Sequence, residues 1–504
     1  MPDLAAWMRS QGRVYFGNAA TKRDLRVQLR GNKAILLWTF YLVVFVAVAI
    51  YTYSQIAAAG RHTSISYAQA QLQTFYYAVL ALLGGIVSVI APALGATAIV
   101  SERQRRSLDL VFTAPVSAKY YLVGKLLSTY RYIWMLLLLS LPVVSVGVIM
   151  GGATWADVAK TLLIISIDAL LFSAIALGIS AGATKLTTAV ILSYLVVGII
   201  CMFTVSMTAS MAFMGMRSHG KSLPVFFLFS PFTAAYGADS TTLLFGTEVP
   251  NVALFCPIAA AVLFVIILAA GSALSPWHVK ESKWLRIIGL GLAGLFGYLV
   301  GPTFAFSPSV SADDVAKGLA GLGLAILPVV PFLACYIKSE PPKFEYDGRS
   351  RLKKIFTAAP SGALPYVLAM PLFLSAGFLS VQDFSKPDIF ECILYATVFL
   401  VGLYALVWSI SRFSSRVATN LSASRGLTIV FTMAILFVPT VLVSATSYSG
   451  SRSPFEKVIP LAIFYARENE AVVGLVSGGF FAVVAYLIAR GTEKFRAEDW
   501  RLEN

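Results

Sequence analysis

Apolar runs of about twenty residues recur along the whole chain, and they constrain its fold more than any other feature. Such a run, wound as a helix, crosses a hydrocarbon core about 30 Å thick. Only helices and closed barrels satisfy the backbone in lipid, and uninterrupted runs favour helices over barrel strands. Charged residues make up only 12% of the 504, which excludes an ordinary soluble enzyme. The sequence therefore predicts an all-α polytopic membrane protein.

Twelve runs qualify as transmembrane spans. We place them at 34–55, 73–100, 122–149, 161–180, 186–210, 252–274, 285–302, 314–337, 363–380, 389–410, 426–447 and 470–489. With both termini in the cytoplasm, 27 Lys and Arg residues lie in inner segments and 7 in outer loops, as the positive-inside rule predicts. The net charge of +15 therefore reflects topology, and we expect no nucleic-acid partner.

A charged break at 275–284 divides the spans into two halves of six helices each. The predicted organisation is a cytoplasmic N-terminal region at 1–33, a first half at 34–274, a cytoplasmic linker at 275–284, a second half at 285–489 and a cytoplasmic tail at 490–504. Even span numbers give the two halves the same orientation. Small residues spaced for close helix packing occur in the seventh span, at Gly289, Gly294, Gly297 and Gly301.

A basic amphipathic segment precedes the first span. Its cations, at a spacing of 3, 4 and 3, are Arg23, Arg26, Arg30 and Lys33. Leu25 and Leu29 repeat at four, so cations and leucines lie on distinct faces of one helix. Such an elbow helix would lie at the membrane surface, with its cations at anionic lipid headgroups. Either it only anchors the chain, or it also contacts a cytoplasmic partner.

The loop after the second span combines charges with apolar side chains. The charged cluster consists of Glu102, Arg103, Arg105 and Arg106. The segment that follows contains Leu108, Asp109, Leu110, Phe112 and Pro115. A short helix with charges and apolar side chains can dock in a groove of a soluble protein, and the proline would end it. The alternative is a solvated loop that only obeys the positive-inside rule.

This loop resembles the corresponding loop of ABC-2-type ABC transporter permeases. That family typically reads E-R-x-x-G-T-L-(D/E)-L-L, then a proline-serine element, then Gly-Lys. Here Glu102 and Arg103 begin the match, T-A-P-V-S follows at 113–117, and Gly124-Lys125 ends it. The stretch at 23–31 also resembles the basic elbow of the family. The family's Gly-Thr is replaced by Arg106-Ser107, which puts the local turn in doubt.

The resemblance implies a permease subunit of an exporter in the bacterial cytoplasmic (inner) membrane. It would dock on a separate nucleotide-binding ATPase subunit, present in two copies, which binds ATP and Mg. The chain itself would bind no cofactor and catalyse no reaction, and the substrate expected from the family is apolar or amphipathic. Either one chain forms a pseudo-dimer from its two halves, or two chains form a homodimer.

Two further features bear on function. The stretch at 215–222 matches the letters of a phosphate loop, but it follows a span and precedes Leu223-Pro224 in an outer loop, so we expect no nucleotide there. The outer segment 211–251 is unusually apolar, and it is either re-entrant or a belt of aromatic side chains at the headgroups.

Asp168 is the one acid near the middle of a span, and Arg131 lies inside the third span. Such groups are costly in lipid and face the protein interior, so the sequence suggests an Asp168–Arg131 pair, either structural or in contact with substrate. The alternative function is a secondary transporter or channel driven by an ion gradient. Such a protein would need several acids buried in its spans, and only Asp168 meets this requirement. A membrane-embedded enzyme would need clustered acids, histidines or a metal, and no such pattern is visible.

Overall fold

The computed structural model describes residues 32–59, 65–106, 118–149, 153–213, 225–244, 247–274, 279–305, 312–335, 363–381, 387–418, 421–447 and 472–502. The chain forms two compact units, Met1–Pro276 and Trp277–Asn504. Their boundary falls within the segment 275–284, where the sequence places the linker between the halves. Each unit is described by itself below.

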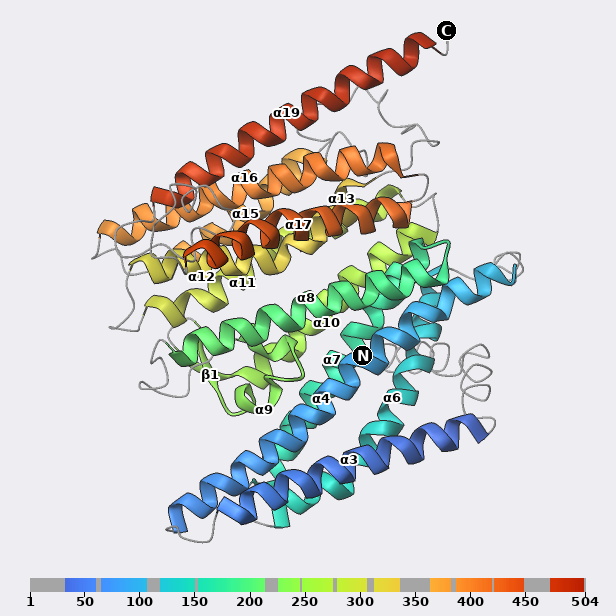
Figure 1. Cartoon of the computed structure of the whole chain (residues 1–504), viewed down its shortest axis with the longest axis vertical. Coiled ribbons are helices and arrows are strands. Elements are labelled where there is room, and N and C mark those ends of the chain that lie inside the picture. The colour runs from blue at the N-terminus through green and yellow to red at the C-terminus, as the bar shows by residue number, and fades with distance from the viewer. Residues whose placement is uncertain are drawn as a thin grey trace, which may run out of the picture. The chain divides into compact units, whose positions relative to one another are not determined.

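Among its described residues, the first unit contains six long helices and a short segment of mixed secondary structure (Figure 1). The helices are α3 (Asn32–Ala59), α4 (Ile65–Gln104), α6 (Ala118–Ile149), α7 (Trp155–Gly182), α8 (Leu186–Phe213) and α10 (Asn251–Leu274). Between α8 and α10 lie η3 (Val225–Phe229), α9 (Ala234–Gly237), β1 (Thr241–Leu244) and β2 (Thr247–Pro250). The two strands pair antiparallel, with Thr241 opposite Pro250, and are the one exception to the predicted all-α fold in the described part of the chain.

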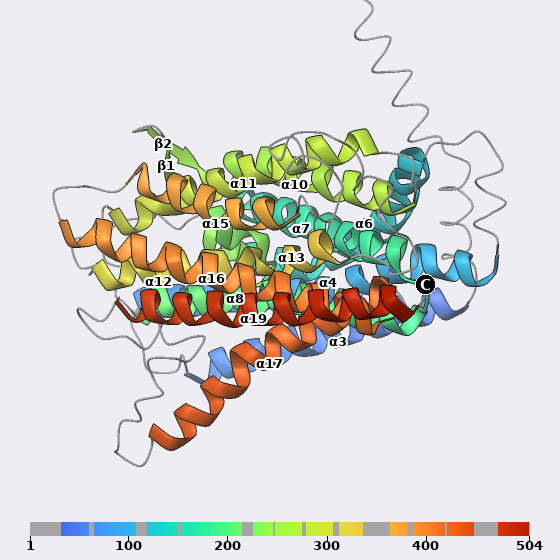
Figure 2. The same cartoon turned by 90° about the horizontal axis from the view of Figure 1, so that it is seen from above.

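The second unit is built around α16, which packs along α19 and also contacts α12, α15 and α17 (Figure 2). Its elements are α11 (Val279–Ala305), α12 (Ala312–Ile326), η4 (Leu327–Val329), α13 (Val330–Ala334), α15 (Ala363–Leu379), α16 (Pro387–Val417), α17 (Leu421–Ser447) and α19 (Val472–Leu502). As the small-residue spacing predicts, α11 packs closely on α15, because a side chain at Gly297 would meet the backbone of Leu374.

The chain is a helical, multi-pass integral membrane protein. Within the described residues, six helices are long and apolar enough to cross a membrane. They are Leu72–Gln104, Ala118–Ile149, Trp155–Gly182, Asn251–Gly271, Asp388–Val417 and Val473–Gly491. Five shorter apolar helices of 10–17 residues accompany them, at Trp38–Ser54, Leu186–Met202, Leu285–Gly301, Leu364–Leu379 and Ala423–Leu436.

Several predicted boundaries differ from the structure. The eighth span is not one helix, because α12 gives way to η4 at Leu327, where Pro328 lacks an amide hydrogen and clashes with the preceding turn. The predicted linker is partly helical, since α11 begins at Val279. The predicted tail continues α19 to Leu502. In both of these cases a helix extends beyond its apolar run into polar residues, which hydropathy alone does not detect.

Helices α4 and α7 run parallel and in close contact, and this pair positions the features described below. Near one end, the hydroxyls of Tyr76 and Thr161 lie 3.4 Å apart. Farther along, a Cβ at Gly95 would come within 2.5 Å of the carbonyl oxygen of Ser173, so glycine is needed for this approach. At the other end, Ser180 binds the backbone of α4.

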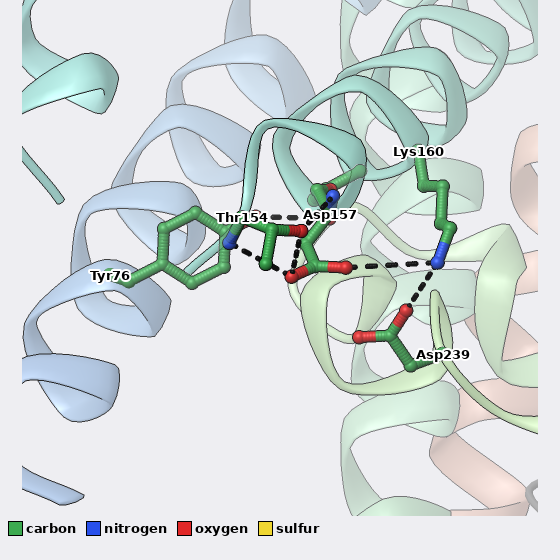
Figure 3. Close-up of polar contacts among 6 residues, drawn as sticks. Tyr76, Thr154, Asp157, Lys160 and Asp239 are labelled. Carbon is green, nitrogen blue, oxygen red and sulfur yellow. Dashed lines mark hydrogen bonds and ion pairs between the residues drawn. The ribbon is translucent and has the colours of Figure 1, made fainter. Parts of the chain in front are cut away.

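Helix α7 begins at Trp155 because a capping box closes its N-terminus (Figure 3). The backbone amide of Asp157 donates to the Thr154 hydroxyl at 3.3 Å, and the Asp157 carboxylate accepts from the Thr154 amide at 3.0 Å. These two bonds satisfy amide groups that would otherwise lack partners at a helix start.

Candidate functional site

The charged end of α4 is tied to the start of α6 by an ion pair. The Lys125 ammonium donates to Glu102 Oε1 at 2.6 Å, and the Tyr121 hydroxyl donates to the other carboxylate oxygen. The side chains of Lys125 and Glu102 are only 7% and 14% exposed. The ammonium also lies 5.8 Å from the centre of the Tyr121 ring, within the range of a cation–π contact. One carboxylate therefore joins two helices through a largely desolvated contact.

The next residue, Arg103, ties α4 to α7. Its guanidinium donates to the carbonyl oxygen of Ala181 at 2.7 Å and to that of Ala183. The last carbonyls of a helix have no partner within the helix and carry partial negative charge. The guanidinium satisfies two such oxygens and brings a positive charge to the negative end of α7. Glu102 and Arg103, adjacent in sequence, thus hold two different helices.

One helical turn earlier, Ser180 inserts its hydroxyl into the backbone of α4. The hydroxyl donates to the carbonyl oxygen of Ala96 at 2.7 Å, and it accepts from the amides of Ile99 and Val100 at 3.2 and 3.1 Å. A buried apolar cluster from four helices packs around this contact, with Ile99, Tyr121, Leu122, Leu126, Ala174, Leu177, Ala181 and Ala270 at its centre. We call Glu102, Arg103, Tyr121, Lys125 and Ser180 the α4–α6–α7 junction.

Arg106 lies in the turn just beyond the end of α4. Its φ of 56° is left-handed, and its amide donates to the carbonyl oxygen of Arg103 at 3.1 Å. Helices commonly end with a left-handed residue just beyond their last turn, and glycine is favoured there because it has no Cβ. Arg106 occupies the position of the family's glycine and adopts the conformation that glycine favours.

Several predicted site residues lie outside the described residues. From the loop these are Leu108, Asp109, Leu110, Phe112 and Pro115, and from the elbow helix Arg23, Arg26 and Arg30. Lys33 lies in the first turn of α3, but its side chain is not among those described, and the stretch 215–222 lies outside as well. Of the described loop residues, Glu102 and Arg103 are half-buried in the junction, whereas Arg105 and Arg106 are exposed.

The junction also contains residues that sequence reasoning did not select. Lys125 and Tyr121 are four residues apart and so share one face of α6. Lys125 belongs to the Gly-Lys element of the family pattern, and that element is the sequence signal that could have identified it as a site residue. No spacing rule connects Glu102 with a residue 23 positions later, and nothing in the sequence indicated Ser180.

The predicted Asp168–Arg131 pair is wrong. Neither carboxylate oxygen of Asp168 has a hydrogen-bond partner in the structure. The α7 residue that faces α6 is Ser166, whose hydroxyl lies 2.5 Å from that of Tyr130. Two positions along a helix correspond to a rotation of about 200°, so Asp168 points away from α6.

The segment between α8 and α10 packs against the middle of α4 as well as near the start of α7. A Cβ at Gly84, about halfway along α4, would lie 2.7 Å from the carbonyl oxygen of Pro231. At the start of α7, the Lys160 ammonium lies 2.8 Å from Asp239 and 3.7 Å from Asp157 (Figure 3). An ion pair therefore links this segment to the N-terminal part of α7.

In the part of the chain that the structure describes, no group of three or more His, Cys, Asp or Glu residues is arranged to hold a metal ion. No known protein family, curated protein or solved structure matches the chain.

Proposed function

We propose that the chain is the transmembrane permease subunit of an ABC-2-type exporter, driven by ATP hydrolysis in a separate nucleotide-binding subunit. The observation that carries the proposal is the Glu102–Lys125 ion pair. The two residues come from separate elements of the family pattern, one at its start and one at its end. If the pattern marks one structural unit, Glu102 and Lys125 should be in contact. A chance match of the sequence letters would not predict that contact.

The junction gives this function a mechanical basis. The loop 107–117 connects α4 to α6, and the ion pair holds the two helices together just beyond the loop. Arg103 and Ser180 couple α4 to α7 at the same end. A force that the ATPase applies to the loop would therefore reach three helices together. Packed side chains and buried polar contacts of this kind transmit displacements as rigid-body motion.

In this proposal Leu108, Leu110 and Phe112 enter a groove of the ATPase, and Asp109 with Arg105 and Arg106 sets its orientation. Twelve spans cross the membrane, both termini are cytoplasmic, and ATP with Mg binds only to the partner. Two ATPase copies bind either to two chains or to the two halves of one chain. The aromatic outer segment suits an apolar or amphipathic substrate.

The first test is to purify the tagged chain from its native membrane in mild detergent and to analyse what co-purifies by native mass spectrometry. Two ATPase subunits per chain would indicate a pseudo-dimer, and two with two chains would indicate a homodimer. Recovery of the chain without an ATPase, under conditions that preserve other ABC complexes, would contradict the proposal.

The second test changes the loop. Leu108→Ala with Asp109→Lys should weaken ATPase binding at least tenfold while the helical content and detergent-solubilised size of the chain stay unchanged. The control is Asp239→Lys, which also reverses an exposed acid but in the segment between α8 and α10. Unchanged ATPase binding and transport in the loop variant would refute the docking assignment.

A transporter driven by an ion gradient is the second candidate, and Asp168 is the observation that favours it. Transport by the purified chain alone in vesicles, under an imposed proton or sodium gradient, would support this alternative. Transport that requires added ATPase and ATP would exclude it.

A further inference from the structure

Asp168 lies in the middle of α7 and is fully buried, at 0% exposure. Both of its carboxyl oxygens are without a hydrogen-bond partner. Buried acids in proteins are normally paired with a cation or held by several donors, because an isolated buried charge is very costly. Inside a membrane protein such an acid is by default a candidate functional group.

The helices around Asp168 offer no counter-charge. The elements α8, η3, α9 and α10 contain no Asp, Glu, Lys or Arg. On α4 the charges are at the junction, and on α6 they are Lys119, Lys125 and Arg131, none of which contacts Asp168. The other titratable side chains on these packed helices are tyrosines and cysteines, among them Tyr76, Tyr130, Cys201 and Cys256, and the helices contain no histidine.

Small polar groups lie on the elements that pack around Asp168. The contacts between Tyr76 and Thr161 and between Gly95 and Ser173 lie on either side of Asp168 along the α4–α7 pair, so Asp168 is level with the part of α4 that contains Gly84 and Ser88. The Ser88 hydroxyl of α4 lies 4.0 Å from the Cys201 sulfur, and the Ser230 hydroxyl is itself buried without a hydrogen-bond partner. These buried or partly buried polar groups come from four elements, namely α4, α7, α8 and the segment after η3.

The segment after η3 closes this cluster at α4. Pro231 follows Ser230 and packs on Gly84, and the Ser88 hydroxyl donates to the Gly84 carbonyl oxygen at 2.8 Å. The contact is tight, because even a methyl group at Gly84 would collide with the Pro231 backbone. Movement of this segment away from α4 would open a route for water to the buried polar groups.

We propose that Asp168 is a proton-binding site in the first unit, neutral while the segment after η3 packs on α4 and ionised when that segment moves away. In the closed state the carboxyl is a neutral acid, which avoids an unpaired charge in the interior. On opening, its O–H bond breaks, the proton passes to water as hydronium, and the electron pair stays on the carboxylate. This inference goes beyond the proposed permease function and concerns the isolated chain, so the two can fail separately.

Infrared spectroscopy of the chain in lipid nanodiscs tests the closed state. At about pH 7, where a solvated aspartate is ionised, we expect a carbonyl band of a protonated carboxylic acid without hydrogen bonds. The band should be lost in Asp168→Asn. Because that variant could fold poorly, the wild-type chain with 13C in its aspartate carboxyl groups is measured in parallel, and the band should move to lower frequency. A wild-type spectrum without such a band, or a band that the aspartate label does not move, would overturn the proposal.

Glycine variants test the coupling to the segment after η3. Gly84→Ala should displace Pro231 and reduce the band at about pH 7 at least twofold, because water reaches Asp168. The matched control is Gly198→Ala in α8, where an added Cβ meets nothing within 4 Å, and the band should stay unchanged. Equal bands in the wild-type and Gly84→Ala chains would overturn the link between opening and ionisation.

Discussion

The Glu102–Lys125 ion pair can be tested quantitatively with a double-mutant cycle. Glu102→Gln removes the charge but keeps an oxygen that accepts from Tyr121, and Lys125→Met keeps an unbranched stem in the same space. Because the two side chains are only 14% and 7% exposed, each single variant leaves a largely buried charge without its partner. Breaking a buried pair in this way costs about 3–5 kcal/mol, so we expect each variant to lose about 3 kcal/mol of unfolding free energy.

The double variant should lose about as much unfolding free energy as one single variant, because it removes both charges together and leaves neither one buried without a partner. The coupling energy of the pair is then about 3 kcal/mol, at the upper end of the range for neighbouring residues. The assay is unfolding in mixed micelles with increasing denaturing detergent, followed by circular dichroism, with ATPase binding measured on the same samples.

The matched control is the Lys160–Asp239 pair, whose side chains are 43% and 52% exposed. An exposed pair contributes about 0–1 kcal/mol, so the cycle of Lys160→Met and Asp239→Asn should show weak coupling. If the Glu102–Lys125 cycle gave a coupling energy below about 1 kcal/mol, the reasoning from burial would be refuted. The junction would then be held by apolar packing alone.

Three further outcomes are expected in the same assay. Arg106→Gly should raise the unfolding free energy by about 1 kcal/mol, because glycine adopts the left-handed conformation without the steric cost of a Cβ. Arg105→Gly should not raise it. Equal effects of the two substitutions would contradict backbone strain at Arg106. Ser180→Ala should lower the unfolding free energy by about 1–3 kcal/mol and speed amide hydrogen exchange in the last turns of α4, because it removes a buried hydroxyl that bonds three backbone groups of α4. Gly95→Ala should lower the unfolding free energy by about 1–3 kcal/mol, because the added methyl group collides with α7. Gly198→Ala should raise it by up to about 1 kcal/mol, because the position is open and alanine is the better helix former.

Hydropathy could predict that the chain is helical and spans a membrane, because the bilayer sets the length of an apolar run. It could not predict where helices end, because a helix continues beyond the membrane for as long as its backbone bonds form. Helix α4 thus extends from Ile65 to Gln104, well beyond the apolar run at 73–100. Hydropathy also missed the break in the eighth span, although Pro328 and Pro331 were visible in the sequence.

The candidate site was predictable only where a pattern had a local physical cause. The sequence assigns Glu102 and Arg103 to the ATPase-docking loop, whereas the structure shows their side chains bound to α6 and α7. Their partners were not selected, because pairing across 23 residues depends on how α4 and α6 pack. The Asp168–Arg131 prediction failed for a related reason: opposite charges on neighbouring spans attract only if both face the same interface, and helix rotation is not fixed by charge.

The order of the two charges in Glu102-Arg103 follows from what each residue faces. Consecutive residues of a helix point about 100° apart, so one faces α6 while the next faces α7. The α6 side presents the Lys125 ammonium, and the α7 side presents the carbonyl oxygens of Ala181 and Ala183. Exchanging the two would set a guanidinium against an ammonium and a carboxylate against the negative end of a helix. The same composition in the reverse order would therefore push both helices away from α4, which is why the junction needs glutamate first and arginine second.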